Sequence, residues 1–153
     1  IDFEPGETEQ RVFLDGKEVT HDIRLPKVAA NVSAVAAVPA VREEMTKQQR
    51  QIAENGGIVM DGRDIASVVL PDADVKVYLT ASSHTRAKRR YMELIEKGET
   101  ADLEKIEQDI IERDYRDMHR EHSPLVQAED AVLIDSSNLT IEEVTERILA
   151  LCR

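Results

Sequence analysis

Three short segments of the sequence combine residue types that can bind a phosphate. The first is Asp61-Gly62-Arg63-Asp64, which directly follows the apolar run Ile58-Val59-Met60. A carboxylate in that place can hold a magnesium-bound water, the glycine lets the backbone turn sharply, and the planar guanidinium of Arg63 suits a phosphate. The alternative is an ordinary strand-to-loop turn with a surface ion pair, and the tetrapeptide alone does not decide between the two.

The second segment has Arg113, Asp117 and Arg120 at positions i, i+4 and i+7 of an expected helix, which predicts that they share one face. Two guanidiniums with a carboxylate between them can bind an anion and also accept a hydrogen bond from a sugar hydroxyl or an amino group. The alternative is a solvated ladder of salt bridges, which is the commoner use of this spacing. The nearby His119 and His122 are too loosely spaced to predict a metal site.

The third segment is a run of cations, Arg86, Lys88, Arg89 and Arg90, in a chain whose formal net charge is −11. This local reversal of sign can close over a polyphosphate. A basic helix face on an otherwise acidic protein is the competing interpretation.

The composition excludes several classes of protein. Hydrophobic residues make up 41% and charged residues 33% of the 153 residues, as in a soluble globular domain. The net charge of −11 and an aromatic content of 3% argue against a nucleic-acid polymer as partner. No apolar run approaches the roughly 18 residues that span a bilayer, so no membrane association is expected. A single cysteine, Cys152, excludes an internal disulfide framework and fits a reducing cytoplasm.

The elements that position these segments begin with a small antiparallel sheet. Residues 1–3 alternate as in a strand, and residues 10–14 and 17–19 flank Asp15-Gly16, a dipeptide typical of a type I′ hairpin. A short helix is expected within 28–38. A second helix is expected from Pro39 to a C-cap at Asn55-Gly56-Gly57.

The rest of the chain alternates between strands and helices. Strands are expected at 58–60, 75–79 and 131–134, and such spacing predicts a parallel α/β sheet. Ligands bind at the carboxyl ends of such strands, so the chemistry is expected just after Met60, Leu79 and Ile134. The local signals for the helices are a cap at Ser82 or Ser83 with an end near Gly98, a start at Asp102, a capping box of Thr140 and Glu143, and a final apolar stripe of Ile141, Val144, Ile148 and Leu151.

In this order, the segments resemble one family over nearly the whole chain. The runs GGIVMDGRDIASVVLPDADVKVYLTAS, RAKRR and IIERDYRDMHREHSPLVQAEDAVLIDSSNLTIEEV are similar to bacterial cytidylate kinases. The resemblance implies a P-loop kinase-type parallel sheet flanked by helices, with a small antiparallel β insert that binds the nucleoside monophosphate. It divides the chain into this insert (1–37), core (38–81), lid region (82–112) and core (113–153). The implied enzyme transfers the γ-phosphate of ATP, bound with Mg²⁺, to CMP or dCMP. It is expected to be a cytoplasmic monomer.

The resemblance also assigns roles to individual residues. Arg63 would hold the acceptor phosphate, Arg113 would line the cleft at the sugar or phosphate, and Asp61 would lie near the magnesium. Arg86 and Arg90 would be lid arginines that close on the donor phosphates. The residues expected to recognise the cytosine and hold the nucleotide are Ser33, Arg42, Asp64, Asp117 and Arg120. Ala66-Ser67 stands where the family usually has Gly-Thr, a change expected to alter only the local turn.

One departure from the family pattern is larger. None of the six glycines stands in a G-x-x-x-x-G-K-[ST] loop, whose backbone N–H groups and lysine hold the donor phosphates. The chain is therefore expected to be a fragment that lacks the donor site and the first core strand, is inactive alone, and is prone to associate. The alternatives are a P-loop kinase for another small substrate such as UMP or shikimate, a non-catalytic nucleotide-binding module, and an acidic interaction domain.

Overall fold

The computed structural model of the protein describes residues 1–7 and 9–153, and at residues 26, 29, 30 and 33 it describes the backbone only. The chain divides into two compact units, Ile1–Met45 and Thr46–Arg153. The division falls within helix α2 (Pro39–Ala53), and each unit is described by itself.

The first unit opens with the expected antiparallel sheet, in the order β1 (Asp2–Glu4), β2 (Arg11–Leu14) and β3 (Lys17–Glu18). The turn between β2 and β3 confirms the sequence prediction, because Asp15 has φ of 50° and Gly16 has φ of 78°. A type I′ turn needs positive φ at both of these positions, and its twist matches that of the paired strands.

Two helices follow the sheet. A 3₁₀ turn, η1 (Asp22–Arg24), leads into α1 (Pro26–Ala36), and α2 then starts at Pro39 as the sequence predicts. Proline suits this first helical position because its missing N–H would have no partner inside the helix. The chain leaves α2 through Gly56 and Gly57, which have φ of 67° and 63°.

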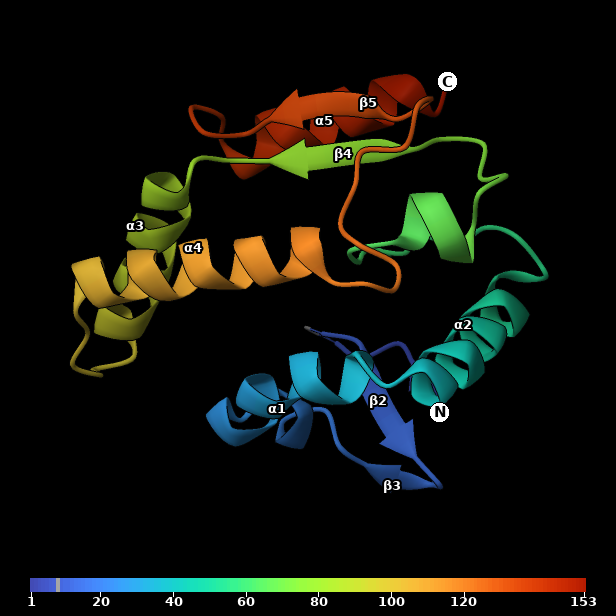
Figure 1. The fold of residues 1–153 in the computed structure, drawn as a ribbon, viewed down its shortest axis with the longest axis horizontal. Helices are drawn as coiled ribbons and strands as arrows, with labels where there is room; N and C mark the ends of the chain where they lie inside the picture. Colours follow the sequence, from blue (N-terminus) through green and yellow to red (C-terminus); the bar gives the residue numbers. More distant parts are fainter. Residues whose placement is uncertain (8) are drawn as a thin grey trace. The chain divides into compact units, whose positions relative to one another are not determined.

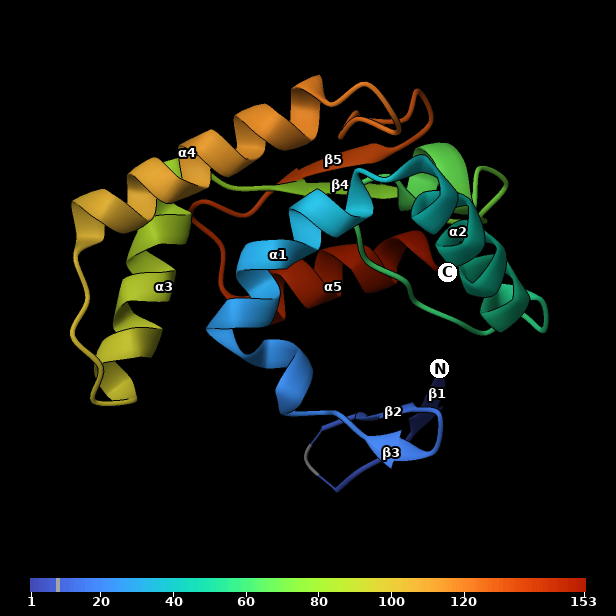
Figure 2. The same cartoon turned by 60° about the horizontal axis from the view of Figure 1, so that its bottom comes forward.

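The second unit is built on two parallel strands, β4 (Val77–Thr80) and β5 (Val132–Asp135). Their register pairs Val77 with Val132 and Thr80 with Asp135, so their carboxyl ends meet at one edge. Figure 1 shows the two strands side by side, and Figure 2 shows α4 on one side of them and α5 on the other. Together with the antiparallel sheet, this parallel pair confirms the α/β class predicted from the sequence.

Three helices complete the second unit: α3 (Ser83–Glu96), α4 (Leu103–His119) and α5 (Ile141–Leu151). Their starts follow the caps predicted from the sequence. Ser82 accepts from the backbone N–H of Thr85, Asp102 accepts from that of Lys105, and Thr140 forms a capping box with Glu143. Helices α3 and α4 pack against each other (Figure 1). None of the helices in the described ranges is both long and apolar enough to cross a membrane.

Two sequence predictions in this unit are wrong. Ile58–Met60 is not a strand: it pairs with no strand among the described residues, and Val59 is 97% exposed. An apolar run becomes a strand only when a neighbour takes up its N–H and C=O groups. Ile141 does not belong to a buried stripe, because it is 82% exposed at the first turn of α5. Val144, Ile148 and Leu151 are half-buried, as expected for the inner face.

The core of the second unit is small and includes unusual polar members. Its buried apolar residues are Val69, Ala81, Ala87, Ala131 and Ile134. Two carboxylates, Asp64 and Asp117, are buried as well, with 6% and 7% exposure. Burying a carboxylate costs free energy unless a partner offsets its charge. The partners of Asp64 and Asp117 therefore mark a candidate functional site.

Candidate active site

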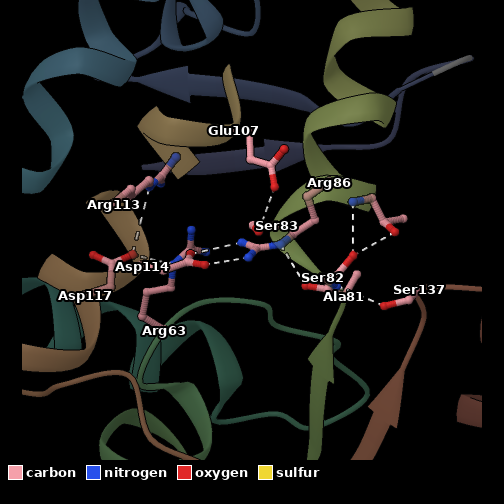
Figure 3. Close-up of polar contacts among 11 residues, drawn as sticks. Arg63, Ala81, Ser82, Ser83, Arg86, Glu107, Arg113, Asp114, Asp117 and Ser137 are labelled. Carbon is pink, nitrogen blue, oxygen red and sulfur yellow. Dashed lines mark hydrogen bonds and ion pairs between the residues drawn. The ribbon is translucent and has the colours of Figure 1, made fainter. Parts of the chain in front are cut away.

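Asp117, in the C-terminal half of α4, lies beside Arg63 of the DGRD segment (Asp61–Asp64) and near the residues that follow β4 (Figure 3). Arg63, Arg86, Arg113, Asp114 and Asp117 all belong to the second unit, and Figure 3 shows them close together. The chain after β4 enters α3 at this edge. The sequence predicts chemistry just after Met60, Leu79 and Ile134. Residues that follow Met60 and Leu79 lie together here, although residues 58–60 form no strand.

Asp117 joins two of the predicted arginines. Its Oδ2 accepts a hydrogen bond from Arg63 Nε at 3.0 Å and lies 3.9 Å from Arg113 Nε. The side chain of Asp117 is only 10% exposed, while those of Arg63 and Arg113 are 42% and 49% exposed. The carboxylate thus holds Arg63 by a hydrogen bond and Arg113 by an ion pair, and both arginine side chains remain accessible to an anion.

Asp64 and Arg120 form a second pair in the same unit. Asp64 Oδ1 lies 3.8 Å from Arg120 Nη2, and the two side chains are 7% and 18% exposed. Arg120 Nε donates to the carbonyl oxygen of Ser123 at 2.5 Å. Arg120 Nη2 is buried and makes no hydrogen bond with any described residue. The charge of this guanidinium is offset by the nearby carboxylate of Asp64.

The prediction that Arg120 shares a helix face with Arg113 and Asp117 is wrong. Helix α4 ends at His119, and Arg120 already has extended backbone, with φ of −65° and ψ of 144°. The chain then turns through Ser123, with φ of 50°, which precedes Pro124 and so cannot continue a helix. Arg120 reaches the site from this turn.

Arg86 is held by a partner that the sequence analysis did not identify. Its Nη1 and Nη2 donate to Asp114 Oδ1 and Oδ2 at 3.0 and 2.5 Å, and its Nε donates to the carbonyl oxygen of Ala81 at 3.0 Å (Figure 3). The hydrogen bonds to Asp114 raise the pKa of Arg86 above its ordinary value. No local pattern could signal this pair, because 28 positions separate the two residues.

The run of cations on α3 is not one cluster. Arg89 donates to the carbonyl oxygen of Ser136 at 2.6 Å and so ties α3 to the chain after β5. Arg90 pairs with Glu93 of its own helix at 2.7 Å. Lys88 is exposed. Of these four cations, Arg86 is the one whose contacts among the described residues include a carboxylate of α4. That the four close together over a polyphosphate stays a prediction.

The remaining predicted residues are placed differently. Asp61 is exposed and has no ion pair among the residues that the structure describes. Gly62 beside it is required by a close approach, since a Cβ there would lie 2.8 Å from Ile65 Cγ1. Arg42 is half-buried on α2 in the first unit. The side chain of Ser33 lies outside the described part of the chain.

Chemically, the site combines guanidiniums with carboxylates that fix them. Such an arrangement can bind a phosphate through Arg63 and Arg113 and a neutral polar group through Asp64 and Arg120. The described residues contain no group of three or more metal-ligating side chains. Phosphate-binding groups at the carboxyl edge of a parallel sheet are typical of α/β proteins that bind nucleotides.

Comparison with known proteins agrees with the class of nucleotide-binding α/β proteins. A model of the cytidylate kinase family matches residues 2–153. A cytidylate kinase from Limosilactobacillus reuteri (strain DSM 20016) is 68% identical over 97% of this chain and 65% of its own length. Those from Ligilactobacillus salivarius (strain UCC118) and Streptococcus pneumoniae (strain Hungary19A-6) are 55% and 53% identical, over 66% and 68% of their lengths. This chain belongs to the cytidylate kinase family, and it spans about two thirds of the length of these relatives.

Proposed function

We propose that the protein containing this chain transfers the γ-phosphate of ATP to CMP or dCMP, giving CDP or dCDP. The observation that carries the proposal is the convergence of Arg63 and Arg113 on the buried carboxylate of Asp117, beside the pair of Asp64 and Arg120. The relatives named as cytidylate kinases support the choice of substrate.

In this proposal the acceptor phosphate binds between Arg63 and Arg113. Both arginine side chains are partly exposed, and Asp117 holds Arg63 by a hydrogen bond and Arg113 by an ion pair before the nucleotide arrives. Ordering these side chains in advance lowers the entropic cost of binding. Catalysis of phosphoryl transfer depends mainly on positioning the substrates and on electrostatic stabilisation of the transferred group. Arginines are therefore more important here than a nucleophilic side chain.

We further propose that Asp64, Asp117 and Arg120 recognise the cytosine, while the roles that the resemblance implies for Ser33 and Arg42 stay predictions. The exocyclic amine of cytosine needs an acceptor, and its ring carbonyl needs a donor. A carboxylate supplies the first, and the Arg120 guanidinium, whose side chain is 18% exposed, supplies the second. UMP has a carbonyl in place of the amine, so a carboxylate acceptor disfavours it.

The donor side of the reaction is proposed to use Arg86 and Arg90, which would neutralise the ATP phosphates as the lid region closes. Mg²⁺ typically binds one or two carboxylates together with phosphate oxygens and water. Asp61 fits this use, because it is an exposed carboxylate with no ion pair among the described residues. When bound, the ion would offset charge on the phosphates being brought together. The exclusion of water by closure would protect ATP from hydrolysis.

Because these 153 residues contain no G-x-x-x-x-G-K-[ST] pattern, we propose that they bind the acceptor nucleotide and do not catalyse the transfer by themselves. We also propose that the whole protein acts as a monomer in the cytoplasm, which the single exposed thiol of Cys152 suits.

A coupled kinase assay on the full-length protein tests the proposal. CMP and dCMP should be phosphorylated in strong preference to UMP and shikimate. Arg63→Ala should weaken CMP binding by about 2 kcal/mol, or roughly thirtyfold in Kd, because a charge-assisted contact to the phosphate is lost. Arg116→Ala is the matched control, since Arg116 is exposed and donates only to its own helix at Glu112.

Three results would contradict the proposal. Equal rates with UMP or shikimate would remove the cytosine-specific part. Calorimetry that detects CMP binding by the full-length protein, together with no phosphoryl transfer from ATP, would favour a non-catalytic nucleotide-binding module. An absence of nucleotide binding, with Arg63→Ala silent, would favour an acidic interaction domain.

A further inference from the structure

The DGRD segment is followed by a rare kind of turn. Ile65–Val69 forms a single π-helical turn, η2, with Asp64 as its N-cap. The carbonyl oxygen of Asp64 accepts from the N–H groups of Val68 and Val69 at 2.8 and 3.2 Å, and that of Ile65 accepts from Leu70 at 2.7 Å. The backbone of Asp64 is therefore set by the geometry of this turn. Turns of this kind occur often at functional sites.

The side chain of Ile65 in the same turn also lies close to Gly62. At Gly62 a Cβ would lie 2.8 Å from Cγ1 and 3.0 Å from Cδ1 of Ile65, so a larger residue there would have to displace the Ile65 side chain. Arg63 sits between Gly62, which lies close to the Ile65 side chain of η2, and Asp64, whose carbonyl oxygen accepts the first hydrogen bonds of η2. A change in the winding of η2 would therefore move Arg63, whose Nε must meet Asp117.

The C-terminal end of η2 is held by Arg50. Its Nε donates to the carbonyl oxygen of Val69 at 2.9 Å, and its Nη2 donates to that of Val68 at 2.7 Å. Val69 is only 1% exposed. A one-turn helix leaves its last carbonyls without partners inside the helix, and these carbonyls form the negative end of its dipole. The forked, charged guanidinium of Arg50 satisfies two of them at once.

We propose that Arg50 is a positioning residue for the acceptor site, acting through η2 to place Arg63 against Asp117. This proposal rests on the proposed function, in which Arg63 binds the acceptor phosphate. Without Arg50, the carbonyl groups of Val68 and Val69 lose the hydrogen bonds that its guanidinium donates. The π-helical turn η2 is then no longer favoured over a more tightly wound helical turn. A lysine at this position carries the charge but offers no planar fork, so it cannot hold both carbonyls in the same way.

The test compares the full-length wild type with Arg50→Ala, Arg50→Lys and the control Arg116→Ala. CMP binding is measured by calorimetry at a temperature where circular dichroism shows each variant folded. Arg50→Ala should raise the Kd for CMP about tenfold, equivalent to about 1.4 kcal/mol. Arg50→Lys should restore part of the affinity, and Arg116→Ala should leave it unchanged. Unchanged affinity in Arg50→Ala, or full recovery in Arg50→Lys, would overturn the proposal.

A double-mutant cycle separates positioning from general destabilisation. If Arg50 acts by placing Arg63, the Arg50→Ala change should cost little further affinity in an Arg63→Ala background. Losses that simply multiply would show that Arg50 acts elsewhere and would reject the proposal.

Hydrogen exchange provides a readout that does not depend on the nucleotide. The amide protons of Val68, Val69 and Leu70 should exchange faster in Arg50→Ala than in the wild type. If the wild type binds no CMP, the proposed function fails, and the exchange data still decide whether Arg50 holds η2. Unchanged protection of these amides would overturn the role of Arg50 even if CMP binds.

Discussion

At the scale of single residues, the candidate site places each arginine against a carboxylate before any ligand is bound. Asp117 meets Arg63 and Arg113, Asp114 meets Arg86, and the Arg120 guanidinium lies beside Asp64 in the same unit. The carboxylates keep the guanidiniums from repelling one another. They also fix the planes in which the N–H groups point. Asp117 has the largest share in this, because it is buried and serves two partners.

Asp117→Asn should therefore affect both binding and stability. The amide keeps the shape of the side chain but removes the charge between Arg63 and Arg113, so CMP affinity should fall by at least about tenfold. The free energy of unfolding should fall by about 1–2 kcal/mol, less than for a fully buried pair because both arginines are partly exposed. Calorimetry and thermal unfolding measure the two effects. Asp109→Asn, at an exposed position of the same helix, is the control. Wild-type affinity in Asp117→Asn would show that the carboxylate does not organise the site.

The sequence predicts these residues only where they are close along the chain. Arg113 and Asp117 are one helical turn apart, so their contact follows from the spacing alone. Arg63 and Asp117 are 54 positions apart, and only the resemblance to a family brought them to one site. Arg50 is beyond both kinds of prediction, because it touches backbone carbonyls 18 and 19 positions away and any arginine on an exposed helix looks the same.

At the scale of elements, helix starts were predictable because a cap is a local interaction. The N-caps at Ser82, Asp102 and Thr140 each close a hydrogen bond within three residues, so sequence pattern and structure agree. The strand expected at 58–60 failed for the opposite reason. Its backbone groups need a neighbouring strand, and an apolar run contains no information about whether that neighbour is in place.

The capping box of α5 permits a clean test of this view. In Thr140→Ala the side chain no longer accepts from the N–H of Glu143, and the free energy of unfolding should fall by about 1 kcal/mol. For a protein of this size, this corresponds to a melting temperature lower by about 2–4 °C. Thr145→Ala is the matched control, because the Thr145 hydroxyl donates only to Ile141 within the same helix. CMP affinity should be unchanged in both variants. An equal loss of stability in both would show that threonine packing, and not the cap, is responsible.

At the scale of the whole molecule, the net charge of −11 and the arginine site have opposite signs. Paired guanidiniums present little free positive charge at long range, so a large polyanion gains little from approaching an acidic protein. A small phosphate that enters the site can contact the N–H groups that the carboxylates leave unused. The pairing thus favours a compact anionic ligand over a polymer. It links the acidic composition, which was evident from the sequence, to contacts that only the fold reveals.

The second unit also exposes apolar side chains near its strands. Val59 is 97% exposed in a segment with no strand partner among the described residues, and Leu79 on β4 and Leu133 on β5 are 54% and 55% exposed. Unpaired extended backbone with apolar side chains promotes pairing between chains. A polypeptide consisting of residues 1–153 alone is therefore expected to self-associate as its concentration rises.

Substitution at Val59 tests whether that association uses the extended segment. Val59→Lys should shift the polypeptide toward monomer in sedimentation velocity experiments, because a charge in an exposed apolar segment opposes its pairing with another chain. Ile141→Lys makes the same charge change at a residue that is 82% exposed but belongs to helix α5, whose backbone groups are largely bonded within the helix. It should therefore leave the association nearly unchanged. An equal effect of both substitutions would point to general apolar exposure, and a sedimentation coefficient independent of concentration in the wild type would rule out the association itself. If Val59→Lys alone reduces the association, the segment 58–60 is its source. Its composition favours a strand, but no strand among the described residues lies beside it to pair with.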